Sequence, residues 1–314
     1  MDGQYLTGML LRVLRENNLS QFLPLRTQYD YLWKAATQFV KRARCMSENQ
    51  VITTVASQAT YDQNPDFLQF NLMDTYNRYF VTYFDGTNTN NVYFRDYSMV
   101  VYQNVTQPVP LPFNFTNNDK QGPVTNITGT AANTSNVLTD ATAPFTNSAG
   151  VQLVFPGDIV HDTTSGAYGL VTQFQSSTSV VTALFDASTG STVETWTAGD
   201  GYVIVPQGRK QLILNPPPLA SGCTVTIPSY IRRPSPVYTP YDSYAIDSQY
   251  ALALVYYACW LAKYQDEEPQ LGDSFYKYWD AQVREGVRDQ QKGLNRIGYR
   301  VNMVKRSYDD RSYR

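Results

Sequence analysis

The sequence predicts an α+β fold with a helical bundle core of about four helices, antiparallel β-hairpins and one inserted small all-β domain,. Apolar residues recur at helical spacing near both ends of the 314-residue chain,. The middle of the chain is instead rich in Thr, Asn, Ser and β-branched residues, as short strands are,. The charge is divided too, because residues 50–208 carry three basic and twelve acidic side chains, whereas residues 277–314 carry ten basic and five acidic ones.

The N-terminal region predicts two helices. Residues 4–17 place Leu6, Leu10 and Leu14 on one helical face, and a second helix is expected over residues 26–46,. The apolar stripe of this second helix consists of Tyr29, Leu32, Trp33, Ala36, Phe39, Val40 and Ala43.

Aromatic and β-branched residues then predict two pairs of short strands. Turns over residues 57–58 and 85–91 separate the members of each pair. The expected strands are residues 51–55, 59–61, 77–84 and 92–101.

Residues 103–150 differ from what precedes them. They carry several prolines and few apolar residues, so we expect a long connection or a poorly ordered linker there,. Strands return within residues 151–206, where Gly157-Asp158 and Gly199-Asp200 mark two similar turns. This segment predicts a small antiparallel sheet or barrel, inserted between two strands of the main body. Its expected strands are residues 151–155, 159–161, 167–171, 180–184 and 202–205.

The chain then returns to the main body. Residues 211–215 and 224–230 predict a hairpin, followed by helices over residues 243–265 and 270–291,. We expect Trp33, Phe39, Leu254, Trp260 and Trp279 to be buried between the four helices. The predicted domains are a discontinuous core of residues 1–122 and 208–292, an inserted β-domain with its linker over residues 123–207, and an extended basic tail over residues 293–314.

The motifs of common enzymes are missing from this sequence. There is one histidine, His161, and there is no phosphate-binding glycine motif and no Cys-x-x-Cys pair,. The three cysteines, Cys45, Cys223 and Cys259, form no motif and are expected to be buried free thiols,. A glycosidase-type pair of carboxylates, such as Asp62 with Asp66, stays open because the separation of two carboxylates is a tertiary quantity. We therefore expect no catalytic residue, no cofactor and no metal, with a carbohydrate-active enzyme as a remaining alternative.

Two kinds of partner are disfavoured by the pattern of charge and hydropathy. The longest apolar run, residues 251–262, is too short to cross a bilayer, so no membrane contact is expected,. The basic tail interleaves cations with aromatic residues, as binders of single-stranded nucleic acid do. The whole chain nevertheless has a net charge of −2, which argues against a dedicated DNA-binding protein,.

The order of several motifs resembles the head-to-tail adaptor (connector, head-completion) proteins of tailed bacteriophages. Members of that family similarly order two helices, a hairpin, a β segment that ends in Arg-Arg-Pro, and two closing helices. The resemblance covers roughly residues 30–102 and 209–290, and the insert and the 103–150 connection depart from it. The matching stretches are residues 31–45 (YLWKAATQFVKRARC), 51–62 (VITTVASQATYD), 64–69 (NPDFLQ), 212–215 (LILN, followed by three prolines), 224–233 (TVTIPSYIRR, followed by Pro234), 250–264 (YALALVYYACWLAKY) and 273–283 (DSFYKYWDAQV).

The resemblance implies a structural virion protein in the neck between head and tail, made in the host cytoplasm. It implies a homo-oligomeric ring, commonly a dodecamer, that binds the portal protein above and tail or neck proteins below. Such a ring would line the DNA channel used in genome ejection, with non-specific contact with DNA. We expect the tail to dock on the portal as an extended strand, through Arg296, Tyr299, Arg300, Lys305, Arg306 and Tyr308,. The alternative within the virion is another tail, baseplate or fibre-attachment protein.

Overall fold

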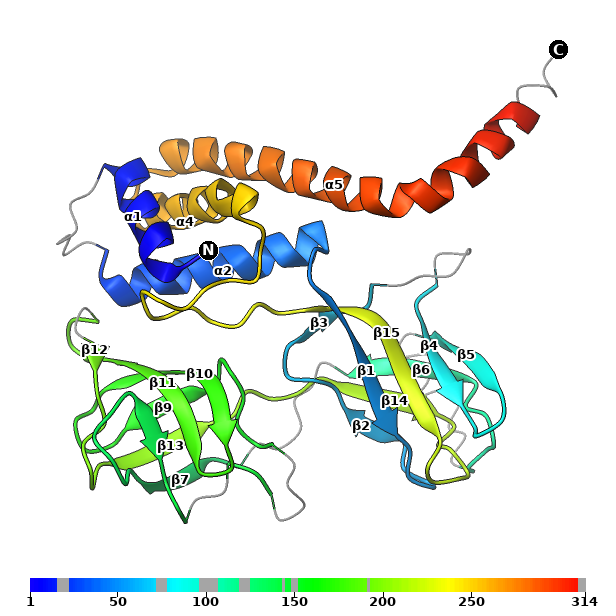
Figure 1. The fold of residues 1–314 in the computed structure, drawn as a ribbon, viewed down its shortest axis with the longest axis horizontal. Helices are drawn as coiled ribbons and strands as arrows, with labels where there is room; N and C mark the ends of the chain where they lie inside the picture. The colour runs from blue at the N-terminus through cyan, green and yellow to red at the C-terminus, as the bar shows by residue number, and fades with distance from the viewer. Residues whose placement is uncertain are drawn as a thin grey trace.

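The computed structural model describes residues 1–15, 23–71, 78–95, 107–118, 125–142, 145–147, 152–190 and 193–309, with the side chains of Asn118, Val193 and residues 290–309 outside the description. Figure 1 shows a layer of helices with two β-rich bodies side by side on one of its faces. The last helix continues well past the helical layer and ends far from both β bodies (Figure 1).

The helical layer is built from both halves of the chain. The side chain of Asp2 caps the first helix by accepting a hydrogen bond from the backbone N–H of Tyr5 (2.7 Å),. Phe39, Leu254 and Trp279 lie at most 1% exposed in the core between the helices. The helices are α1 (Gly3–Leu14), α2 (Leu25–Ala43), the 3₁₀ turn η1 (Ser248–Tyr250), α4 (Ala251–Gln265) and α5 (Pro269–Asp309).

The first β body is a sheet of eight described strands that nearly closes on itself, and we call it the first barrel. Its strand order is β1-β15-β4-β5-β6-β14-β2, with β3 also paired to β15. The buried side chain of Gln50 joins the two ends of the sheet, because it accepts from the N–H of Asn64 (3.0 Å) and donates to the carbonyl of Asp62 (3.3 Å). The strands are β1 (Ser47–Thr53), β2 (Thr60–Asp62), β3 (Phe67–Gln69), β4 (Phe80–Phe84), β5 (Thr89–Phe94), β6 (Asn114–Asn118), β14 (Gln211–Asn215) and β15 (Thr224–Arg232).

The second β body, the second barrel, has seven described strands in the order β12-β11-β10-β9-β13-β7, with β8 paired to β11. Its largely aliphatic core includes Trp196 and Tyr202, and the polar atoms of these two rings are satisfied inside it,. Trp196 donates to the hydroxyl of Thr182 (2.8 Å), and Tyr202 donates to the carboxylate of Asp140 (2.9 Å). The strands are β7 (Ile127–Thr130), β8 (Val137–Thr139), β9 (Ile159–Asp162), β10 (Tyr168–Ser176), β11 (Ser179–Phe185), β12 (Val193–Glu194) and β13 (Gly201–Val205).

The predicted fold class is wrong. The described chain is mostly β, and its two barrels are larger than the helical layer, so it is not a helical bundle core carrying a small all-β insert. Long helices give a strong periodic signal in a sequence, whereas strands of three to five residues give a weak one,. The strands β6, β7 and β8 lie within residues 103–150, where a connection or linker was expected.

The pairing of the strands also differs from the prediction. The expected hairpin of residues 211–215 and 224–230 does not form, because β14 pairs with β2 and β6 while β15 pairs with β1, β3 and β4. The residues flanking the 57–58 turn do not pair with each other either, since β1 and β2 lie at opposite ends of the sheet order. The predicted pair around residues 85–91 is confirmed as β4 and β5, although residues 96–101 lie outside the description.

The C-terminal segment expected to be extended is instead helical as far as Asp309. The physical reason is present in the sequence. Apolar residues recur at spacings of three and four, which is helical periodicity, and no proline interrupts them. The recurring residues are Leu294, Ile297, Val301, Val304 and Tyr308.

Two of the five aromatic or apolar residues expected to be buried between the helices are not fully buried there, although Trp33 packs against the helical core and Trp260 contacts Tyr276 of α5. Trp33 and Trp260 are only half-buried. Trp33 lies against a separate apolar cluster, where α2 meets the second barrel, together with Tyr29, Phe185 and Tyr238. The second barrel is therefore attached to the helical layer by an apolar contact, while its chain connections lead to β6 and β14 of the first barrel.

Candidate functional site at the junction of the two barrels

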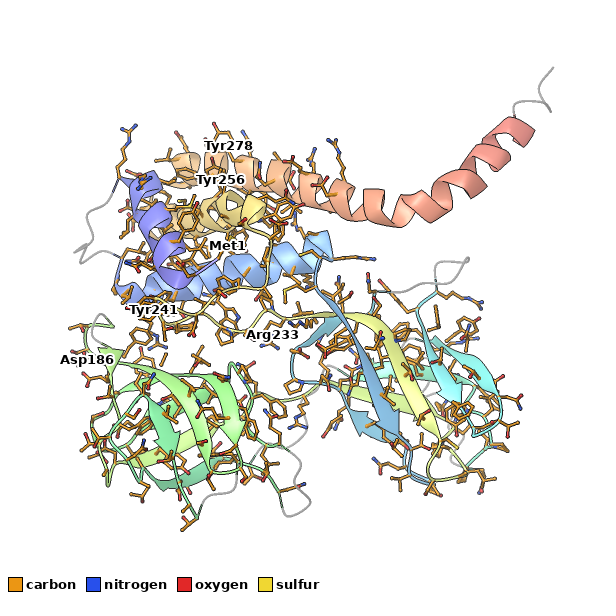
Figure 2. All side chains as sticks on the ribbon, viewed as in Figure 1. Met1, Asp186, Arg233, Tyr241, Tyr256 and Tyr278 are labelled. Atoms are coloured by element: carbon orange, nitrogen blue, oxygen red, sulfur yellow. The ribbon has the colours of Figure 1, made fainter. Side chains whose placement is uncertain are left out.

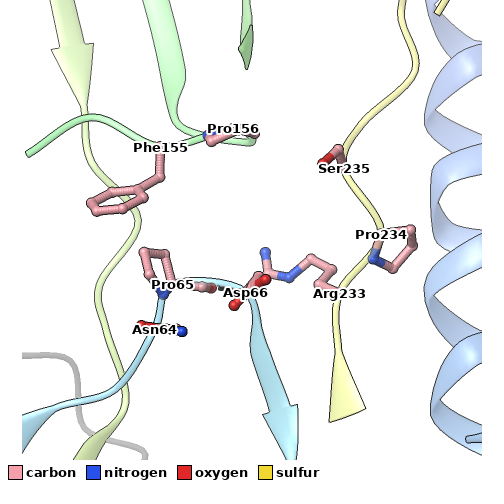
Figure 3. Close-up of a pocket in the computed structure, with 8 residues that line it drawn as sticks. All are labelled: Asn64, Pro65, Asp66, Phe155, Pro156, Arg233, Pro234 and Ser235. Atoms are coloured by element: carbon pink, nitrogen blue, oxygen red, sulfur yellow. Dashed lines mark hydrogen bonds between the residues drawn. The ribbon is translucent and has the colours of Figure 1, made fainter. Parts of the chain in front are cut away.

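Three segments that are distant in sequence meet between the two barrels and the helical layer. They are the connection from β2 to β3, the turn before β9, and the chain that leaves β15. They enclose a pocket of about 250 Å³, drawn in Figure 3. The pocket is lined by Asn64, Pro65, Asp66, Phe155, Pro156, Arg233, Pro234 and Ser235.

The local sequence makes the turn before β9 rigid. Pro156 fixes its own φ, and Gly157 takes a φ of +98°, which only glycine adopts without strain,. The carboxylate of Asp158 then accepts from the backbone N–H of Phe155 (2.7 Å), closing the turn, and from that of Gln207 (2.8 Å). Asp158 is 2% exposed, so this carboxylate is held inside the protein.

Gln207 joins the second barrel to the rest of the molecule. Its amide nitrogen donates to the carbonyl of Gly157, and its amide oxygen accepts from Nη1 of Arg233 (2.6 Å). Arg233 in turn donates through Nη2 to the carbonyl of Pro65 (3.3 Å), and its backbone N–H donates to the carbonyl of Asp66 (2.6 Å). A continuous chain of hydrogen bonds therefore runs from the second barrel to the first barrel.

The junction holds buried charges of both signs. Burial raises the pKa of the Asp158 carboxyl to about 6, opposed by the N–H groups of Gln207 and Phe155 and by the charges of Arg209 and Arg233,. The guanidinium of Arg233 stays charged at neutral pH.

Burial also shifts the pKa values of the carboxyl and guanidinium groups that line the pocket, in each case against the charged form. Burial raises the pKa of Asp66, against the hydrogen bond that the hydroxyl of Tyr230 donates to it (2.9 Å). Burial lowers the pKa of Arg233, against the attraction of Asp66 and Asp158. Figure 3 shows the guanidinium of Arg233 and the carboxylate of Asp66 facing one another.

This geometry fixes two bodies relative to each other, and the histidine and cysteines singled out in the sequence lie outside the pocket lining. His161 lies on β9 with its ring stacked against Tyr168 (6.2 Å between ring centroids) and does not line the pocket. Burial raises the pKa of the Cys45 thiol to about 11 and that of Cys259 to about 12, so neither thiol is a thiolate at neutral pH,. Asp62 is exposed on β2, whereas Asp66 faces the pocket.

The six residues predicted from the sequence lie on the last turns of α5, in the part whose side chains are outside the description. The helical backbone makes positions 296, 299 and 300 neighbours, whereas an extended strand would alternate them between two faces,. The prediction that this segment is added as a strand to a partner sheet is wrong for residues up to Asp309. The choice of Arg296, Tyr299, Arg300, Lys305, Arg306 and Tyr308 as partner-binding residues stays a prediction.

Sequence reasoning missed the residues of the junction. The turn at Gly157-Asp158 was visible as a motif, and Arg233 was visible as the end of an Arg-Arg-Pro segment. Nothing in the sequence distinguishes Gln207, because an isolated glutamine after a strand is ordinary. A covarying pair of positions in related sequences is the signal that would have connected residues 207 and 233.

No protein-family model matches the chain, and no curated protein sequence matches it. Within the part of the chain that the structure describes, no helix combines the length and apolarity needed to cross a bilayer. Over the same described residues, no three His, Cys, Asp or Glu side chains gather closely enough to hold a metal ion.

Proposed function

We propose that this chain is a structural protein of the neck of a tailed bacteriophage. In this proposal a ring of copies joins the portal of a DNA-filled head to the tail and surrounds the DNA channel. The motif order in residues 30–102 and 209–290 supports it, as does the hydrogen-bonded connection between the two barrels.

The observation that carries the proposal is the 41-residue helix α5. Its first part packs on the helical layer through Trp279 and Val283, and Figure 1 shows its last part projecting beyond that layer. Residues 290–309 alone span about 30 Å as a helix, since each residue rises about 1.5 Å,. Residues 277–314 carry ten basic and five acidic side chains, so the projecting end brings positive charge to a partner. An acidic surface on a portal ring is such a partner.

The proposal is tested on DNA-filled heads that lack this protein. Wild-type protein should bind these heads and allow tails to join them. A variant with Arg296, Arg300, Lys305 and Arg306 all changed to Gln should fold normally but bind the heads at least about 10-fold more weakly, the effect of losing 1.4 kcal/mol. A chain truncated after Asp309 is the matched control, because it shortens the same end and keeps the four cations of the helix.

Binding is measured by co-sedimentation with heads, and tail joining by electron microscopy. Heads that acquire tails equally well with the four-fold Gln variant would contradict the docking role of α5. Wild-type protein that is found in tails, baseplates or fibres and not at the neck would contradict the proposed location and favour the other virion role.

A further inference from the structure

The pocket at the junction of the two barrels holds two charged side chains whose hydrogen-bond partners are all uncharged. The guanidinium of Arg233 donates to the amide oxygen of Gln207 (2.6 Å) and to the carbonyl of Pro65 (3.3 Å). The carboxylate of Asp66 accepts at Oδ1 from the hydroxyl of Tyr230 (2.9 Å). Both charged residues are half-buried, and no ion pair joins Arg233 directly to Asp66 or to any other described carboxylate. Charges taken out of water are normally paired, so both groups favour a ligand that supplies the opposite charge.

Both groups also keep unused hydrogen-bonding capacity. A guanidinium carries more N–H donors than the two side-chain hydrogen bonds of Arg233 use,. No described donor bonds to Oδ2 of Asp66, and this atom is not sealed inside the protein. The amide oxygen of Asn64 is open in the same way, while its Nδ2 donates to the hydroxyl of Tyr230 (2.9 Å). The pocket therefore offers donors at its positive charge and acceptors at its negative charge.

Most of the remaining lining of the pocket is apolar. It consists of Phe155 and the prolines Pro65, Pro156 and Pro234, and Figure 3 shows these residues around the two charged groups. The volume of the pocket is about 250 Å³. A cavity of about 150 Å³ is large enough to hold benzene. The pocket therefore has room for an apolar group of that size together with a short charged head group.

We propose that the junction pocket binds a free α-amino acid with an apolar side chain. The ammonium and carboxylate groups of such a molecule are bonded to one carbon atom, so a single compact head group can meet both charges of the pocket. Its carboxylate accepts from Arg233, its ammonium donates to Asp66 and to the amide oxygen of Asn64, and its side chain lies against Phe155 and the prolines,.

The charges of the pocket select this class of ligand over two others. A molecule with a single charge leaves either Arg233 or Asp66 without a counter-charge. An apolar side chain from within a partner protein brings neither charge, because its own amino and carboxyl groups are joined in peptide bonds. The inference does not depend on the neck function, because it concerns binding to the isolated chain.

The experiment first compares L-phenylalanine with three analogues on the full-length chain. 3-Phenylpropionate lacks the ammonium group, 2-phenylethylamine lacks the carboxylate, and N-acetyl-L-phenylalaninamide keeps the ring without either charge. Titrations followed by NMR spectroscopy give the dissociation constants. We expect L-phenylalanine to bind with a dissociation constant of about 1 mM or tighter, and each analogue to bind at least about 10-fold more weakly. L-Leucine and L-proline are further probes with smaller side chains.

Matched variants then assign the binding to the pocket. Asp66→Asn removes the charge but keeps the oxygen that accepts from Tyr230, whereas Asp62→Asn makes the same change on β2, outside the pocket lining. We expect Asp66→Asn to weaken L-phenylalanine at least about 10-fold and to abolish its preference over 3-phenylpropionate, while Asp62→Asn stays close to wild type. Phe155→Leu is a second pocket variant, on the apolar wall, and should weaken L-phenylalanine about 5-fold. Circular dichroism and thermal unfolding check that each variant is folded.

Several results would overturn the proposal. One is that none of the three amino acids binds at millimolar concentration, and another is that the folded pocket variants bind L-phenylalanine as the wild type does. Equal or tighter binding of N-acetyl-L-phenylalaninamide would also overturn it, in favour of a side chain from a partner protein. Binding of L-leucine or L-proline without L-phenylalanine would support it, with a smaller side chain in the pocket. Loss of head binding with amino-acid binding intact would contradict only the neck function.

Discussion

The second barrel contains the same turn twice, once at the junction and once at a distance from it. Residues 155–158 and residues 197–200 both place Gly third and Asp fourth. Gly157 has a φ of +98° and Gly199 a φ of +101°. The carboxylate of the Asp accepts from the first residue's N–H at 2.7 Å in each turn, from Phe155 in one and from Thr197 in the other.

The two turns also connect to their neighbouring segments alike. The N–H of Gly157 donates to the carbonyl of Val171, and the N–H of Val171 donates to the carbonyl of Asp158. In the second turn, the N–H of Gly199 donates to the carbonyl of Ala131, and the N–H of Ala131 donates to the carbonyl of Asp200. The strands that follow the turns, β9 and β13, pair with each other. The barrel therefore has an internal structural repeat of its turns, although its sequence shows no close repeat.

The surroundings make the two turns different. Asp158 is 2% exposed and accepts a second N–H, from Gln207, whereas Asp200 is partly exposed. Burial raises the pKa of Asp158 to about 6. A short motif thus sets the shape of a turn, while the packing around it decides whether the turn carries a buried charge that joins two bodies.

Replacing each aspartate by alanine should give the largest contrast. Asp158→Ala leaves two buried N–H groups without an acceptor, and we expect it to lower the free energy of unfolding by about 3 kcal/mol. Asp200→Ala removes one partly exposed hydrogen bond, for an expected loss of about 1 kcal/mol. Urea unfolding at neutral pH measures both, and equal losses would show that the junction adds nothing to the turn.

The second-largest difference between the two turns is expected in how the free energy of unfolding depends on pH. The folded pKa of Asp158, about 6, exceeds the ordinary value of 3.8, so the folded protein binds this proton more tightly than the unfolded chain does,. Its contribution to stability is fully present below about pH 4 and is lost as the pH rises through about 6, at up to about 1.4 kcal/mol per pH unit. Asp158→Asn should remove this slope and Asp200→Asn should retain it. Unfolding free energies measured between pH 4 and 7 decide this, and an unchanged slope in Asp158→Asn would contradict the assignment.

The glycines should show how similar the turns are. Alanine at either position is strained by its positive φ, at a cost of about 1–2 kcal/mol. A Cβ on Gly157 would also lie 3.2 Å from Nε2 of Gln207, while a Cβ on Gly199 meets open space. We therefore expect Gly157→Ala to be the more destabilising of the two by thermal unfolding. A larger loss at Gly199 would contradict the view that only the surroundings differ.

The smallest effect on stability, and the most specific effect on arrangement, is expected at Gln207. Gln207→Ala keeps the backbone bond to Asp158 but removes the side-chain links to Gly157 and Arg233, at an expected cost of about 1 kcal/mol,. Spin labels on the two barrels should then report a broader distribution of distances. Gln211→Ala, which removes an exposed side-chain bond to Asp62 within the first barrel, is the matched control. A distribution as narrow as that of the control would show that the apolar contact alone fixes the barrels.

Two core residues illustrate what helical periodicity predicts and what it leaves open. Phe39 and Trp33 both belong to the stripe on α2, and periodicity alone assigns both to one core. Phe39 is buried in the helical layer, whereas Trp33 is half-buried beside the second barrel and donates to the carbonyl of Pro234 (3.0 Å). The stripe identifies which residues seek burial, but the choice of neighbour depends on a domain more than 100 positions away.

By itself the sequence determined the helices α1, α2 and α4, the β4–β5 pair, most strands of the second barrel and both Gly-Asp turns. These features depend on periodicity, turn residues and capping, and each of these signals lies within about ten neighbouring positions of the sequence. Only the tertiary structure decided that β14 pairs with β2 and β6, that the molecule is mostly β, and that Gln207 meets Arg233. Those outcomes require segments far apart in sequence to bury one another's surfaces. The free energy of that burial depends on both segments together, so neither segment alone predicts it.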